Sequence, residues 1–130
     1  MIDVENDVFD YVYPAVEELL PEGNFSSEYD PAPTSLPFAT LIEEDNYTDN
    51  SLRGTADQEE FAVLMYEANV YATDKAQCRN IMNAIDEAMT GLGFQRISKR
   101  FVPNLADATI FRIVCRYRGG VNQDKTIFRK

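Results

Sequence analysis

Apolar residues between positions 72 and 92 recur at steps of three and four, which is the spacing of an amphipathic helix. Thr73 and Asp74 precede this stripe as candidate N-caps, and Gly91 and Gly93 bracket its end. The stripe consists of Ala76, Ile81, Met82, Ala84, Ile85, Ala88, Met89 and Leu92. We therefore predict a helix over residues 72–92, lying across a sheet built by the flanking segments.

A similar apolar stripe over residues 2–20 predicts an N-terminal helix. Pro14 falls inside this stripe, where proline removes a backbone hydrogen bond. The helix is therefore expected either to bend at Pro14 or to end at Tyr13, with a new helix starting at Pro14. The N-terminal helical segment is expected to end at Pro21, Glu22 and Gly23.

Alternation of apolar and polar residues predicts strands on both sides of the central helix. The predicted strands cover residues 24–29, 37–44, 60–72, 94–102 and 109–118. The face of residues 60–72 expected beneath the helix consists of Leu64, Tyr66, Ala68 and Val70. In residues 109–118 one face is apolar and the other mostly cationic, with Arg112, Arg116 and Arg118. Gly119 and Gly120 are expected to end that strand.

Two polar segments have no predicted element. Residues 45–55 are long for a connection, so they form either a floppy hairpin tip or a functional loop. Residues 121–130 are expected to be a mobile tail or an arm that packs on a neighbour. The sequence thus predicts one α+β domain, residues 1–120, followed by a C-terminal tail or arm, residues 121–130. The expected architecture is a two-layer sandwich: a mostly antiparallel four- to five-stranded sheet with two helices packed on one face.

Charge is unevenly distributed along the chain, whose net charge is −10. Residues 1–93 hold 20 acidic and 3 basic side chains, whereas residues 94–130 hold 2 acidic and 9 basic ones. Either these charges only solvate the surface, or acidic and basic surfaces of different copies meet in an assembly. The acidic balance disfavours direct binding of nucleic acid. No apolar run is long enough for a membrane span, and the acidic N-terminus does not resemble a signal peptide.

The residues that carry most enzyme chemistry are scarce. The chain has no histidine. Its two cysteines, Cys78 and Cys115, are expected to be small residues in or near the core, and the protein is expected to be synthesised in a reducing cytoplasm. Neighbouring carboxylates such as Glu43 and Glu44 point to opposite faces of a strand, so they do not converge. Asp45, Asp49 and Asp57 lack the ligand pattern of a calcium-binding loop. We predict no catalytic residue, no cofactor and no metal site.

The order of segments resembles the small tail terminator proteins of long-tailed bacteriophages and prophages, also called tail completion or head–tail joining proteins. The resemblance covers most of residues 1–120. It rests on the order of the segments along the chain. These are an N-terminal helix, a Pro-rich stretch, residues 38–44, a polar loop, residues 67–72, the helix 76–92, residues 93–96 and a last strand that ends at residues 116–119. It implies a structural virion protein, assembled in the host cytoplasm, that forms a hexameric ring on the last ring of tail tube protein. Such a ring stops tube polymerisation and meets the connector of the head, while DNA passes through its lumen without being specifically bound.

We expect contacts with other subunits or with the tube at nine positions: Arg112, Arg116, Arg118, Asp45, Tyr47, Asp49, Arg53, Ile127 and Phe128. The three arginines lie on one strand face, the next four residues in the polar loop, and the last two in the tail. Two alternatives remain open at this point. One is a head-completion or neck protein of the same virion, and the other is a cytoplasmic adaptor domain or a small enzyme on an α+β scaffold.

Overall fold

The computed structural model describes residues 2–28, 30, 33, 35–48, 61–103, 109–122 and 124–128. In this part of the chain there are two helices, α1 (Glu5–Val16) and α2 (Lys75–Leu92). The strands are β1 (Phe25–Ser26), β2 (Phe38–Thr48), β3 (Phe61–Ala72), β4 (Gln95–Val102), β5 (Phe111–Asn122) and β6 (Ile127–Phe128).

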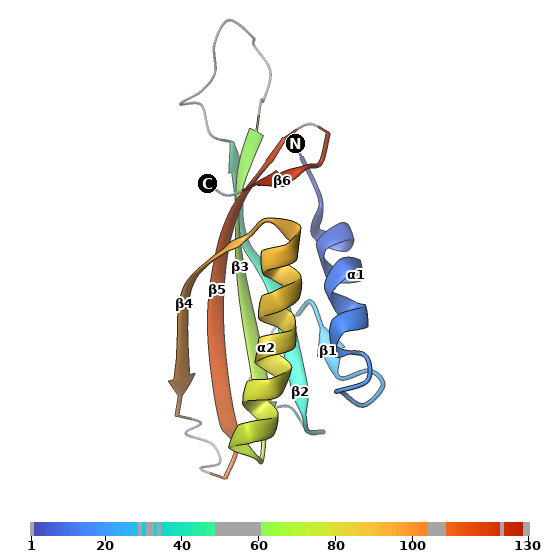
Figure 1. Cartoon of the computed structure of the whole chain (residues 1–130), viewed down its shortest axis with the longest axis vertical. Coiled ribbons are helices and arrows are strands. Elements are labelled where there is room, and N and C mark those ends of the chain that lie inside the picture. Colours follow the sequence, from blue (N-terminus) through green and yellow to red (C-terminus); the bar gives the residue numbers. More distant parts are fainter. Residues whose placement is uncertain are drawn as a thin grey trace, which may run out of the picture.

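The strands form one sheet in the order β1-β2-β3-β5-β4, and β6 pairs with β5. Every pairing is antiparallel except that between β1 and β2. Both helices lie on the same face of this sheet, with α2 across β3 and β5 and α1 beside it (Figure 1). The predicted α+β architecture, a mostly antiparallel sheet with two helices on one face, is confirmed.

The core lies between the helices and the sheet. On β3 it takes in the four residues predicted to lie beneath the helix, Leu64, Tyr66, Ala68 and Val70, which are all buried. Opposite them on β5 are the buried residues Ile113, Cys115 and Tyr117. The period of two in both strands therefore identified the core face correctly.

The predicted caps of α2, Asp74 and Gly93, are also confirmed, although the helix begins at Lys75 and not at residue 72. The side chain of Asp74 accepts a hydrogen bond from the Ala76 N–H at 2.9 Å, which satisfies one of the first free N–H groups of the helix. Gly93 closes the helix with φ of 113°, a conformation that glycine adopts without steric cost. α1 is shorter than predicted and runs through Pro14 to Val16, so no new helix starts at Pro14.

Two predicted strand ends are wrong. β2 continues to Thr48 after an irregularity between Glu43 and Asp45, so residues 45–48 belong to a strand and not to a loop. β5 continues through Gly119 and Gly120 to Asn122. A Cβ atom at Gly119 would lie 2.8 Å from Phe94 Cδ1, and one at Gly120 would lie 2.6 Å from Phe128 Cε2. These glycines therefore make room for aromatic rings inside a strand.

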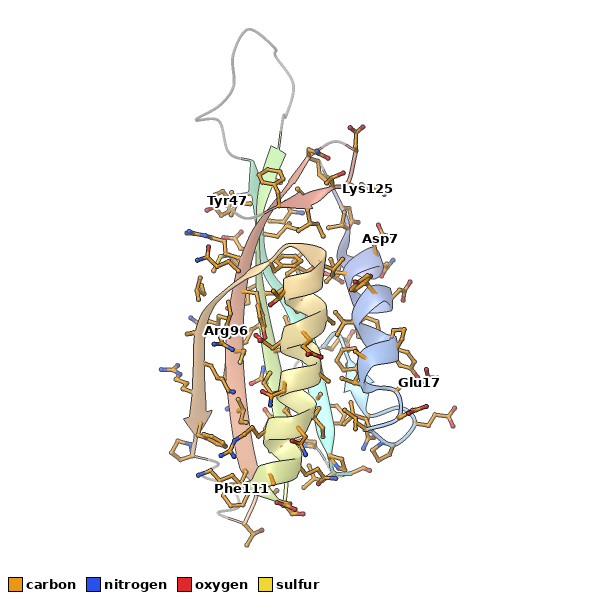
Figure 2. All side chains as sticks on the ribbon, viewed as in Figure 1. Asp7, Glu17, Tyr47, Arg96, Phe111 and Lys125 are labelled. Atoms are coloured by element: carbon orange, nitrogen blue, oxygen red, sulfur yellow. The ribbon has the colours of Figure 1, made fainter. Side chains whose placement is uncertain are left out.

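The expected C-terminal tail or arm is also corrected where it is described. Val121 is buried in the core, and Ile127 and Phe128 turn back to pair with Val121 and Gly120. The N–H groups of Asp124 and Thr126 both bond to the Asn122 side chain at 3.0 Å, which shapes the turn. Tyr47 and Lys125 lie at one end of the long axis and Phe111 at the other (Figure 2).

Candidate functional site

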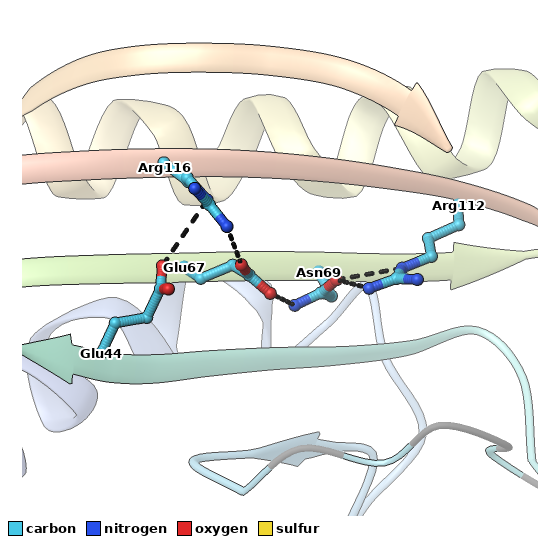
Figure 3. Close-up of polar contacts among 5 residues, drawn as sticks. All are labelled: Glu44, Glu67, Asn69, Arg112 and Arg116. Atoms are coloured by element: carbon cyan, nitrogen blue, oxygen red, sulfur yellow. Dashed lines mark hydrogen bonds and ion pairs between the residues drawn. The ribbon is translucent and has the colours of Figure 1, made fainter. Parts of the chain in front are cut away.

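A polar network crosses the face of the sheet opposite the two described helices (Figure 3). The guanidinium of Arg112 donates two hydrogen bonds to Asn69 Oδ1, from Nη2 at 2.7 Å and from Nε at 3.1 Å. Asn69 Nδ2 donates to Glu67 Oε1 at 2.9 Å. Arg116 Nη2 lies 3.3 Å from Glu67 Oε2, and Arg116 Nε lies 3.7 Å from Glu44 Oε1.

This network follows from strand register. Glu67 lies opposite Arg116 and Tyr71 lies opposite Arg112, so each cation meets an acceptor or an aromatic ring on the next strand. The Arg112 guanidinium is 5.4 Å from the centroid of the Tyr71 ring, within the range of a cation–π contact. Asn69 is fully buried, and its amide is satisfied by Glu67 and Arg112.

The structure thus brings the three predicted arginines onto one face. Arg112 binds Asn69 and Arg116 binds Glu67 within the same chain. Arg118 lies at the position opposite Met65, and its residue is exposed. Their predicted role in subunit association stays a prediction. A sequence pattern of alternating arginines cannot show which of them are already engaged.

The other predicted contact residues lie elsewhere. Asp45 and Tyr47 are exposed on β2 near one end of the long axis, with Tyr47 47% exposed. Ile127 packs against the core, and Phe128 lies against Gly120. Asp49 and Arg53 lie outside the described residues. The seven predicted positions that the structure describes therefore do not form one patch.

Sequence reasoning missed a hollow at the C-terminal end of α1. It has a volume of about 230 Å³ and is lined by Tyr13, Val16, Glu17, Leu20, Pro21, Glu22, Gly23 and Phe25. The aromatic part of its lining is ordered by stacking of Phe9 on Phe25, with ring centroids 4.6 Å apart. Phe25 reaches this position because β1 pairs in parallel with β2, a long-range contact that no local pattern reveals.

The edge strand β4 was predicted, but its exposure was not. All but the last of its residues are exposed, including Ile97 at 44% and Phe101 at 41%. Lys75 Nζ lies 4.8 Å from the centroid of the Phe101 ring, and Arg96 Nη1 lies 3.3 Å from Asp86 Oδ1. Exposed apolar side chains among cations are typical of a contact surface.

A second hollow lies between the start of α1 and β2, lined by Asp3, Glu5, Asn6, Glu43 and Asn46. Burial, together with the charges of Glu5 and Asp3, raises the pKa of Glu43 above its ordinary value, although the hydrogen bond from Tyr66 opposes this shift. Within the described ranges, no group of three or more His, Cys, Asp or Glu side chains could hold a metal ion. Neither described helix is long and apolar enough to cross a membrane.

The sequence matches no family model and no curated protein. In structure this protein is similar to a chain of a solved structure described as "Virion of native gene transfer agent (GTA) particle". The TM-score is 0.58, and the sequence identity is 15%. The match covers 85% of this chain and 90% of that chain. At this identity the similarity shows the fold, which the two chains share over most of their lengths.

Proposed function

We propose that this chain is a structural protein of a phage-like virion, and that within the virion it is the tail terminator. Copies of the chain form a hexameric ring that caps the tail tube, stops its polymerisation and joins the tail to the head. The observation that carries the proposal is the similarity in fold to a chain of a gene transfer agent virion, which covers 85% of this chain and 90% of that chain. The order of segments along the sequence supports the same assignment independently.

The surface of the molecule is compatible with a subunit of a ring. A ring is built from two different patches on each subunit, and this chain separates its acidic and basic residues strongly. A ring of subunits with a net charge of −10 also lets DNA pass, because phosphate attraction is what retains DNA on proteins. In this proposal Asp45 and Tyr47 face the tube, at one end of the long axis.

The test is binding to the ends of purified tail tubes, read by electron microscopy. We expect rings at one end of each tube and shorter tubes when the protein is present during polymerisation of the tube protein. An unrelated acidic protein of similar size is the control. The proposal is wrong if the protein binds neither tubes nor connectors.

One alternative within the virion needs the same experiment with a second target. The name of the similar particle identifies the virion and not the component, so a head-completion or neck protein accounts for the fold equally well. Binding to purified connector but not to tube ends would favour that assignment. Binding to neither, with a host protein retained instead, would favour an adaptor outside the virion.

A further inference from the structure

The two lateral edges of the molecule carry opposite charge. Residues 2–28, which contain α1 and β1, hold eight acidic and no basic side chains. The edge strand β4 holds three basic and no acidic side chains, and its neighbour β5 holds three more basic ones and no acidic ones. The strand order places β1 at one edge of the sheet and β4 at the other, with α1 on the side of β1 (Figure 1). In Figure 2, Asp7 and Glu17 accordingly lie on the opposite side of the molecule from Arg96.

One edge has a hollow, and the other has an exposed aromatic side chain. The lining of the hollow at the end of α1 is mixed: it includes the aromatic residues Tyr13 and Phe25 and the acidic residues Glu17 and Glu22. A cavity of about 150 Å³ is enough to hold a benzene molecule, so a hollow of 230 Å³ can take an aromatic ring. β4 presents such a ring, Phe101, on the same strand face as Lys99, while Arg100 lies between them on the opposite face of the strand.

The charges at these two places have no partners in the described part of the chain. No hydrogen bond or ion pair there engages the side chains of Lys99, Arg100, Glu17 or Glu22, whereas Arg112 and Arg116 bind Asn69 and Glu67. The basic groups free to meet a neighbour are therefore Lys99 and Arg100 of β4. Arg112 and Arg116, on the sheet face opposite the two described helices, are already engaged.

We propose that these edges join copies of this chain head to tail. Phe101 of one copy enters the hollow at the end of α1 in the next, and Lys99 and Arg100 pair with Glu17 and Glu22. The inference rests on the ring proposed above and names its subunit contact. Because the two patches differ, each contact leaves one patch free on either side, and association continues until the ring closes.

A second copy fits these patches better than a foreign protein does. A basic foreign segment would fill the hollow but would leave β4 exposed, whereas a second copy covers both patches with one repeated contact. The C-terminal ends of α1 and β4 also lie in the same half of the long axis (Figure 1). Successive copies thus need little displacement along that axis, which favours a closed ring over a steep helix.

The test exchanges the charges of the two edges. One variant carries Lys99→Glu and Arg100→Glu, and the other carries Glu17→Lys and Glu22→Lys. We expect the wild type to form oligomers in sedimentation velocity at about 0.1 M salt and to dissociate at about 1 M, as the Debye length falls from about 10 to about 3 Å. Each variant alone should sediment as a monomer with an unchanged circular dichroism spectrum.

Mixing the two variants at equal concentration should restore oligomers. The reversed β4 of one variant is acidic and meets the reversed, basic α1 of the other, while the unchanged edges still match each other. Lys125→Glu is the control for a charge reversal away from both patches, because Lys125 only pairs with Asp7 across 3.9 Å at the surface. It should assemble like the wild type.

The aromatic contact is tested separately. Phe101→Ala should weaken association about tenfold or more, since a buried aromatic anchor dominates many interfaces. Tyr47→Ala removes a similarly exposed aromatic side chain from β2, which belongs to neither of the two patches, and should leave self-association unchanged.

Several outcomes would overturn the inference. These are a wild-type monomer at every concentration, variants that assemble like the wild type, or folded variants that stay monomeric when mixed. If Glu17→Lys and Glu22→Lys leave assembly intact but abolish capping of tubes, the hollow binds the tube, and only the subunit contact is wrong. If the exchange restores oligomers that do not bind tubes or connectors, the contact stands and the proposed function fails.

Discussion

Tyr117 of β5 donates a hydrogen bond to Asp86 of α2, with its hydroxyl oxygen 2.9 Å from Asp86 Oδ1. Arg96 Nη1 of β4 lies 3.3 Å from the same oxygen, so one carboxylate joins α2 to two strands. Burial, with the nearby Cys115 and Asp86, raises the pKa of Tyr117 far above its ordinary value, so the phenol stays protonated and keeps donating.

Tyr117→Phe should lower the free energy of unfolding by about 1 to 2 kcal/mol, because it removes a hydrogen bond to a charged acceptor while the ring keeps its packing. Chemical denaturation monitored by circular dichroism measures this loss. Tyr47→Phe is the matched control: its side chain is exposed, so its loss should stay within about 0.5 kcal/mol. Equal stability of Tyr117→Phe and wild type would show that the bond to Asp86 contributes nothing net.

Gly93→Ala should destabilise the fold more than Gly23→Ala does. Both glycines have positive φ, 113° and 84°, for which a Cβ atom costs about 1 to 2 kcal/mol. At Gly93 the new Cβ would also lie 2.7 Å from the Ile127 backbone oxygen, whereas at Gly23 nothing lies within 4 Å. The difference between the losses of unfolding free energy in the two variants therefore reports how tightly β6 packs on the end of α2. A difference near zero would mean that β6 moves away from the new Cβ atom without measurable cost.

Asn69→Ala should cost about 1 to 3 kcal/mol, because it removes the buried amide that links Arg112 to Glu67. Arg116→Ala should cost no more than about 1 kcal/mol, since Arg116 is exposed and its ion pairs are screened by solvent. Thermal unfolding of the two variants side by side tests this ranking. A larger loss for Arg116→Ala would place the stabilising contact of the network at Glu67 and Glu44 instead.

The extent to which the sequence predicts this fold depends on how local each determinant is. Leu64 and Tyr66 were assigned correctly to the core because strand alternation is a local property. Gly119 and Gly120 were misread as a strand end because their role depends on Phe94 and Phe128, each of which comes from another element. A double glycine therefore indicates a turn only when no side chain from another element packs against the two glycines.

The same distinction between local and long-range determinants applies to the candidate contact surfaces. The opposite charges of the two ends of the sequence were visible from composition, and contact between copies was one of the two explanations that they allowed. The hollow beside Val16 and Leu20 was not visible, because Phe25 completes it only after β1 pairs with β2. Nor could the sequence show that Arg112 and Arg116 are engaged by Asn69 and Glu67, since that depends on the register between β3 and β5.

Glu43 provides a prediction about pH. Tyr66 donates a hydrogen bond to Glu43 Oε1 at 3.2 Å, but burial and the carboxylates of Glu5 and Asp3 raise the pKa of Glu43 above its ordinary 4.5. The folded state therefore binds the proton of Glu43 more tightly than the unfolded state does. Stability falls as pH rises from 4.5 through the raised pKa of the folded state, and the cost remains at neutral pH.

Glu43→Gln should remove this cost, because the amide oxygen still accepts from Tyr66 but carries no charge. We expect a higher unfolding temperature than wild type at neutral pH and a gain that shrinks to nothing below pH 4.5, where Glu43 is protonated in both states. Glu44→Gln is the neighbouring control on the opposite face of β2, where the side chain is exposed and pairs with Arg116 across 3.7 Å; it should show no such gain. A Glu43→Gln variant less stable than wild type at neutral pH would mean that the charged hydrogen bond with Tyr66 outweighs the cost of burying the carboxylate.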